Sequence, residues 1–237
     1  MFQIVKKKIK YENIQKDKTE FEKTLKNKSK TPEEKRQAIV EIFTTYRNDF
    51  DAIETLLGII NKNTSKEDSE KAKQEALQAF KDSLKGDYSA DNVKKALQET
   101  INGFYPKDND RVLQDCLVNL KKSEKNIQAT KTCYKFDNNN IGLVYGLGVC
   151  RHMATLVNYL IKNLNKQNIQ ACSTDDVAHA WNYLRFKNGD NSYTYYKVDT
   201  YNSIFVKLDN EEEILEAFEA KYGDKVSIDS AFKMACS

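Results

Sequence analysis

Apolar side chains recur at helical spacing through most of the first hundred residues. They form one continuous stripe over residues 39–57, behind a Thr-Pro-Glu-Glu run at 31–34 that is typical of a helix start. Two further stripes begin after Ser65 and Ser89, both capping residues, and each ends near a glycine. The pattern therefore predicts a mostly helical module over residues 1–105.

The segments of sequence before and after these stripes carry weaker patterns. Phe2, Ile4 and Ile9 are spaced as in a short strand, and residues 11–28 read as a polar helix. Residues 111–122 place their apolar side chains on one helical face. We therefore expect a further helix after the module.

A glycine-punctuated run leads into Cys150. Gly142, Gly146 and Gly148 precede it, and the apolar positions of residues 153–164 then recur at helical spacing. We expect a buried helix that begins at Cys150. The glycines allow a tight turn that brings the Cys150 amide close to a substrate oxygen.

Strand-forming residues follow that helix. Aromatic and β-branched side chains dominate residues 178–186 and 193–198, and a Lys-Asn-Gly-Asp-Asn run separates them, which predicts a β-hairpin. Residues 204–208 form a third short strand. A closing helix begins after Asp209 or Asn210.

Composition limits the class of protein. The hydrophobic content of 40% is that of a globular chain, and a net charge of only +3 argues against nucleic acid as the main partner. No apolar run is long enough to span a membrane, and the first residues lack a secretory signal. We therefore expect a cytoplasmic protein, or an effector exported without a signal peptide into a host cell.

Cysteine and histidine are too few and too scattered for a metal site. The five cysteines form no Cys-x-x-Cys pair, which argues for reduced thiols rather than disulfides or a zinc ribbon. His152 and His179 are the only two histidines, so a histidine-rich metal site is excluded. We expect no metal and no cofactor, and we expect His152 on the surface of the first helical turn.

Three residues carry the candidate chemistry. A thiol attacks a carbonyl carbon as the thiolate, which a helix N-terminus and a neighbouring imidazole both favour. Cys150 begins a predicted helix, His179 begins the predicted hairpin, and Asp199 ends it. Each residue alone also has an ordinary interpretation, as a buried thiol, a hydrogen-bonded strand histidine and a turn aspartate.

The length of the hairpin loop decides whether His179 and Asp199 meet. In a loop centred on Gly189, positions 188 and 190 pair, and so do His179 and Asp199, whose side chains then lie directly opposite on one face. A two-residue turn at 188–189 would instead point Asp199 to the other face. A histidine–aspartate pair therefore requires a loop of odd length.

Short motifs surround these three residues. They are Gly-Val-Cys-Arg-His-Met-Ala at 148–154, His-Ala-Trp at 179–181 and Val-Asp-Thr at 198–200. In residue type, order and spacing they resemble the transglutaminase-like superfamily of papain-like cysteine enzymes. Family members often have proline where Thr200 stands and an acidic or aromatic residue where His152 stands, which leaves the subfamily open.

The resemblance implies an α+β fold with a papain-like core, in which the cysteine helix packs on a small antiparallel sheet. It implies a catalytic domain over residues 106–237, with Cys150 as nucleophile, His179 as base and Asp199 as the acid that orients it. The reaction implied is acyl transfer on protein amide bonds through a thioester. Its outcome is protein cleavage, glutamine deamidation or cross-linking.

Four further residues are candidates for binding the oxyanion or the substrate. Tyr145 and Asn140 lie upstream of the nucleophile, where a second oxyanion donor is expected beside the Cys150 amide. Trp181 shares a strand face with the histidine and either walls the acyl site or belongs to the core. Arg151 either binds a carboxylate or holds the helix start.

The implied partner is a protein or peptide substrate. The helical module over residues 1–105 is a candidate for docking that substrate, for a lid or for an inhibitory cap. A non-catalytic papain-like scaffold for protein–protein interaction is the alternative, although the intact cysteine, histidine and aspartate argue against it. A third interpretation is a helical interaction protein in which the three residues coincide by chance.

Overall fold

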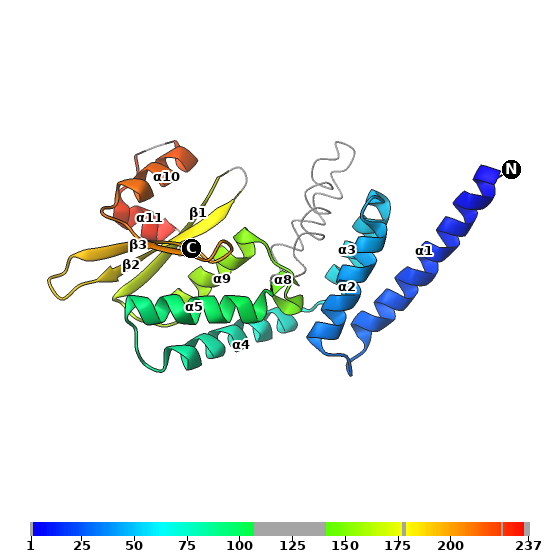
Figure 1. Ribbon diagram of the computed structural model, residues 1–237, viewed down its shortest axis with the longest axis horizontal. Helices are drawn as coiled ribbons and strands as arrows, with labels where there is room; N and C mark the ends of the chain where they lie inside the picture. The colour runs from blue at the N-terminus through cyan, green and yellow to red at the C-terminus, as the bar shows by residue number, and fades with distance from the viewer. Residues whose placement is uncertain (1, 107–140, 177–178, 224, 235–237) are drawn as a thin grey trace. The chain divides into compact units, whose positions relative to one another are not determined.

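A computed structural model of the chain describes residues 2–106, 141–176, 179–223 and 225–234 (Figure 1). The described residues form a mixed α+β protein, as predicted, with a four-stranded antiparallel sheet in the order β1-β2-β3-β4. The first helices are α1 (Phe2–Lys26), α2 (Pro32–Tyr46), α3 (Phe50–Asn63), α4 (Lys66–Leu84) and α5 (Ala90–Phe104). After residue 140 come α8 (Ile141–Tyr145), α9 (Cys150–Lys162), β1 (Ile169–Asp175), β2 (Ala180–Lys187), β3 (Tyr193–Asp199), β4 (Ile204–Lys207), α10 (Glu212–Tyr222) and α11 (Ile228–Met234).

Two compact units interleave along the chain. The first comprises residues 1–72 and 106–147, and the second comprises residues 73–105 and 148–237. The first unit therefore holds α1, α2, α3 and α8, while the second holds α5, α9, the sheet, α10 and α11. This division differs from the boundary predicted at residue 105, because α5 belongs to the helical sequence module but packs against α9.

Helices α1, α2, α3 and α8 share the core of the first unit. α1 is one continuous helix, so the strand predicted for Phe2, Ile4 and Ile9 is wrong. The surrounding lysine- and glutamate-rich sequence has high helix propensity, which outweighs the short apolar spacing. None of the described helices is long and apolar enough to cross a membrane.

The apolar stripe predicted over residues 39–57 belongs to two helices rather than one. α2 ends at Tyr46, and the Asp49 side chain begins α3 by accepting a hydrogen bond from the Ala52 amide at 3.2 Å. The stripe continues across the break because both helices turn their apolar faces to the same core. Apolar spacing alone therefore did not reveal where one helix ends.

α2 begins at the predicted cap. The Thr31 hydroxyl accepts a hydrogen bond from the Glu34 amide at 3.2 Å, and the Glu34 carboxylate accepts one from the Thr31 amide at 2.8 Å. Pro32 occupies the first helical position. The hydrogen bond from the Thr31 amide lowers the pKa of Glu34. α4 and α5 likewise begin directly after the predicted capping residues Ser65 and Ser89.

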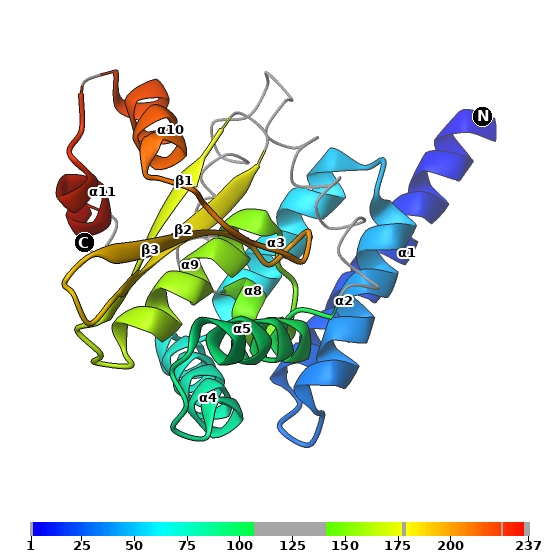
Figure 2. The same ribbon diagram turned by 60° about the vertical axis from the view of Figure 1, so that its left-hand side comes forward.

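The sheet of the second unit has helices on both faces (Figure 2). α9 packs on β1 and β2 from one side, while α10 and α11 pack from the other. The core on the α10 and α11 side is built from Cys172, Tyr183, Ile214, Phe218, Ala231 and Phe232. The sequence analysis did not predict β1 or α11. β1 is rich in small and polar residues, and α11 is only seven residues long, so neither carries a clear periodic pattern.

Candidate active site

Cys150 is the first residue of α9, as predicted. Val149 before it is extended, and the first backbone hydrogen bonds of the helix run from the amides of His152 and Met153 to the Val149 carbonyl. The Cys150 amide precedes these donors and has no acceptor among the described residues. The thiol is reduced and half-buried. The start of α9 thus presents a thiol beside a backbone donor, as a nucleophile and an oxyanion site require.

Two glycines upstream of Cys150 are needed for different reasons. A Cβ added to Gly148 would lie 2.3 Å from Cε1 of Tyr105, whose ring is buried at the end of α5. Gly146 has a φ of +66°, in the left-handed region that favours glycine. The tight approach predicted for this run is therefore a contact between Gly148 and a tyrosine ring.

His179 and Asp199 are joined by a hydrogen bond. Nε2 of His179 lies 2.7 Å from Oδ2 of Asp199, which ends β3 and is only 4% exposed. The histidine side chain, directly before β2, is 26% exposed. A buried carboxylate at this distance fixes the ring orientation. Because the carboxylate occupies Nε2, Nδ1 is the ring nitrogen that remains to accept a proton from a thiol.

The pair forms in a register that differs from the predicted one. Lys187 pairs with Tyr193, so the hairpin loop has the five residues 188–192. Its odd length keeps His179 and Asp199 on one face, as predicted, but direct opposition was wrong because the register is displaced by two residues. The two residues are diagonal neighbours, which long side chains still bridge.

Asn202 also holds Asp199 and was not predicted; its Nδ2 lies 3.3 Å from Nε2 of His179, beside the same carboxylate oxygen. Its Nδ2 donates to Oδ2 of Asp199 at 2.7 Å, and its backbone amide donates to Oδ1 at 3.1 Å. Asp199 is therefore both a turn residue and the partner of the imidazole, two interpretations that the sequence analysis treated as alternatives. An aspartate that accepts an amide a few residues later is typical of turns, and the Asp-x-x-Asn spacing was the available signal.

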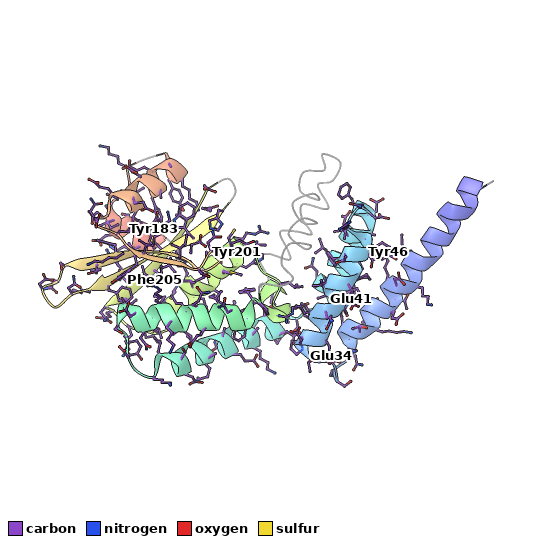
Figure 3. All side chains as sticks on the ribbon, viewed as in Figure 1. Glu34, Glu41, Tyr46, Tyr183, Tyr201 and Phe205 are labelled. Carbon is purple, nitrogen blue, oxygen red and sulfur yellow. The ribbon has the colours of Figure 1, made fainter. Side chains whose placement is uncertain are left out.

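Two aromatic rings flank the imidazole of His179. The Trp181 ring stacks on it at 6.1 Å between centroids, and the Tyr201 ring, which is labelled in Figure 3, is tilted against it at 5.9 Å. The Lys197 ammonium lies 5.1 Å from the centre of the Trp181 ring. Trp181 thus shares the face of His179, as strand alternation predicted. The histidine side chain between these rings remains 26% exposed.

The backbone of His179 is held by Asp176. The His179 amide donates to Oδ1 of Asp176 at 2.7 Å, and the Asp176 amide donates to the His179 carbonyl at 2.9 Å. This pair continues the β1–β2 ladder, in which Asp175 pairs with Ala180. The histidine is therefore anchored at the end of the sheet by its backbone as well as by its ring.

α9 runs in the same direction as β2. Near the middle of the helix, Asn158 donates to Ser173 of β1 at 2.9 Å. Near its end, Ile161 and Lys162 line a cavity together with Ile169, the first residue of β1. α9 is therefore antiparallel to β1, and because β1 and β2 are antiparallel, it is parallel to β2 (Figure 2).

Cys150 and His179 consequently lie at the same end of the sheet. Asn182 of β2 donates to the carbonyl of Ala154 in α9 at 3.0 Å. Cys150 precedes Ala154 by four residues, roughly 6 Å of helix. His179 precedes Asn182 by three residues, roughly 10 Å of strand. Both steps lead toward the N-terminus of α9, although no hydrogen bond joins thiol and ring among the described residues.

His152 is buried, so its predicted surface position is wrong. The residue is 8% exposed, and its Nδ1 accepts a hydrogen bond from the Val149 amide at 3.1 Å. Leu156, one turn later on the same side of the helix, is also buried. The buried face of α9 is therefore wider than the apolar stripe that was used to predict it.

The other predicted binding residues lie in different places. Tyr145 belongs to the first unit, where its hydroxyl accepts a hydrogen bond from Thr64 at 3.2 Å and burial raises its pKa. Asn140 lies outside the described residues. Arg151 is the second residue of α9 and is half-buried. Their roles as oxyanion or substrate ligands stay predictions.

Within the ranges that the structure describes, no group of three or more histidine, cysteine, aspartate or glutamate side chains is arranged to hold a metal ion. No protein family, curated protein or solved structure was found to match this chain. Function is therefore inferred from the geometry of the site and from the motifs around it.

Proposed function

We propose that this chain is a cysteine-dependent acyl-transfer enzyme with a transglutaminase-like, papain-like core, acting on amide bonds of proteins or peptides. The proposal is supported above all by the 2.7 Å hydrogen bond between His179 and the buried Asp199, at the end of the sheet where α9 begins with Cys150. A thiol at a helix start, an imidazole and an orienting carboxylate are the parts of an activated nucleophile.

In this mechanism His179 acts through Nδ1, because Asp199 occupies Nε2. Nδ1 takes the proton of the Cys150 thiol, and the thiolate attacks the amide carbonyl while the Cys150 amide donates to the developing oxyanion. The imidazolium then gives its proton to the leaving amine as the C–N bond breaks, which leaves a thioester on Cys150. Asp199 stabilises the imidazolium and holds the ring.

An acceptor then resolves the thioester. Water yields a carboxylate, which is a cleaved peptide when the donor was a backbone amide and a glutamate when it was a glutamine. A lysine or a small amine yields a new amide bond, which is a cross-link when the amine is the lysine of a protein. All three products arise from one intermediate, so they differ only in the acceptor and in the donor amide.

Alkylation kinetics test the nucleophile. The wild-type chain is treated with iodoacetamide at neutral pH, and labelling of each cysteine is followed by peptide mass spectrometry. We expect Cys150 to react at least about tenfold faster than free N-acetylcysteine, and the advantage to be lost in His179→Gln. Cys172 is fully buried on the sheet and reports unfolding, because it is labelled only when the sheet opens. A Cys150 rate equal to that of N-acetylcysteine would contradict the proposal.

Product analysis identifies the acceptor. The chain is incubated with a glutamine-rich protein, with and without a primary amine, and the products are examined for cleavage, deamidation or amine incorporation. We expect at least one of these products with the wild-type chain and none with Cys150→Ala. A non-catalytic scaffold of the same fold would show no difference between the two proteins in this assay.

A further inference from the structure

The first turn of α9 is held by the imidazole of His152. Its Nδ1 accepts the hydrogen bond from the Val149 amide at 3.1 Å, and the ring is buried. Because Nδ1 accepts, the ring is uncharged and carries its hydrogen on Nε2. Val149 has an apolar side chain and makes no side-chain cap of its own. His152 therefore supplies the side-chain acceptor at this helix start.

Val149 is held on both sides, and it carries Cys150. On the upstream side, Gly148 packs so closely on the Tyr105 ring that no side chain fits between them. On the downstream side, His152 holds the Val149 amide. A displacement of Val149 would move the Cys150 thiol and the Cys150 amide together, which are the two groups that the proposed mechanism uses.

The charge of the acceptor differs between this helix start and that of α2. In α2 the same hydrogen bond to the residue before the helix is made by the Glu34 carboxylate. A carboxylate, which members of the similar family often have where His152 stands, would lie in the same helical turn as Cys150, and its negative charge would oppose formation of the thiolate. An uncharged imidazole provides the hydrogen bond without that opposition.

We propose that His152 is a positioning residue for Cys150: an uncharged cap that fixes the thiol and its amide without adding negative charge beside the thiolate. The inference rests on the proposed function, since it gives His152 a part in activating the same nucleophile. His152 acts through Val149, and the role assigned to it involves no contact with the reacting atoms.

Three variants of the full chain separate the hydrogen bond from the charge. His152→Gln keeps an uncharged acceptor, His152→Glu keeps an acceptor but adds negative charge, and His152→Leu removes the acceptor. For each variant the rate of Cys150 alkylation by iodoacetamide is measured against pH. Hydrogen exchange of the Val149 amide reports the cap, and the Tm reports the fold.

We expect His152→Gln to keep the wild-type rate curve and the protection of the Val149 amide. His152→Leu should lose that protection, and its alkylation rate at neutral pH should fall roughly tenfold. His152→Glu should keep the protection, but the midpoint of its rate curve should move about one pH unit higher.

A structural role alone would lower the Tm of His152→Leu and leave alkylation of the folded protein unchanged at every pH, and that result would overturn the inference. Identical curves for His152→Gln and His152→Glu would overturn the part assigned to charge, and this pair decides the matter if His152→Leu does not fold. A wild-type Cys150 no faster than N-acetylcysteine is a different result, because it removes the proposed function itself.

Discussion

The starts of α2 and α9 use the same hydrogen bond in different surroundings. At α2, the exposed Thr31 and Glu34 each bond the amide of the other, and the result is a solvated cap. At α9, a buried and uncharged His152 bonds the amide of Val149, which has no polar side chain to return the bond. The start of α9 therefore has one side-chain hydrogen bond fewer than the start of α2 and no charged side chain in its cap, and it carries the Cys150 thiol. The helix start that we propose to serve chemistry is thus built differently from one that only begins a helix.

The largest effect should appear when the carboxylate beside His179 and the carboxylate at the start of α2 are each changed to an amide. In the proposed mechanism Asp199→Asn removes the charge that stabilises the imidazolium of His179, so the rate of acyl transfer should fall at least about 100-fold at neutral pH. Glu34→Gln is the matched change at α2 and should leave that rate unchanged. Steady-state kinetics on the amine-incorporation or hydrolysis reaction checks both.

The fold of Asp199→Asn is checked by its Tm and circular dichroism, because asparagine keeps the size of the side chain. Equal rates for Asp199→Asn and the wild-type chain would remove Asp199 from the mechanism. A large loss of acyl-transfer rate in Glu34→Gln would show that the start of α2 also affects the reaction.

The next largest effect concerns the glycine that precedes the start of α9. In Gly148→Ala the new methyl group meets the buried Tyr105 ring, and the repacking should cost about 1–3 kcal/mol of unfolding free energy. Gly103→Ala, near the end of α5, is the control, because a Cβ there meets no atom within 4 Å. Urea unfolding measures both variants, and equal stabilities would contradict the close packing at Gly148.

A smaller effect is expected at the start of α2 itself. Thr31→Ala removes the hydroxyl that accepts from the Glu34 amide, which should cost about 1 kcal/mol of stability. Cys150 alkylation in the folded protein should stay at the wild-type rate, in contrast to His152→Leu. Unfolding and alkylation are measured in parallel to test this contrast. A lower rate of Cys150 alkylation in Thr31→Ala would contradict it.

The smallest expected effect is the acid dependence of the α2 cap. The hydrogen bond from the Thr31 amide lowers the pKa of Glu34, so this bond stabilises the folded chain above the pKa of the unfolded carboxyl. Its contribution is lost as the pH falls through the lower folded pKa. Hydrogen exchange of the Thr31 amide, corrected for the intrinsic pH dependence, should lose protection between about pH 5 and pH 3. Glu34→Gln should show no such change.

The fold was predictable where neighbouring residues specify an element. The caps at Thr31, Ser65 and Ser89 began helices as expected, and the hairpin strands formed close to the predicted ranges. Elements without a strong local pattern were missed, namely α8, β1 and α11. β1 is held as a strand by pairing with β2 and by the helices on both its faces, which are contacts between residues distant in sequence.

The candidate site was likewise predictable from the sequence only in part. Cys150 at a helix start followed from local sequence, whereas the odd loop followed only from requiring that His179 and Asp199 meet on one face. The register of the hairpin followed from neither, because two odd loop lengths satisfy the same alternation. Asn202 and the buried His152 were also missed, since their roles depend on which surface each side chain meets.

The sequence by itself therefore determined where the capped helices begin, the two strands of the hairpin, the candidate nucleophile at a helix start, and the odd loop that a histidine–aspartate pair requires. Only the tertiary structure decided the hairpin register, the packing of Gly148 on Tyr105 and the burial of His152. The physical reason is range: capping and periodicity act within a few residues, whereas burial and register depend on which distant segments pack together.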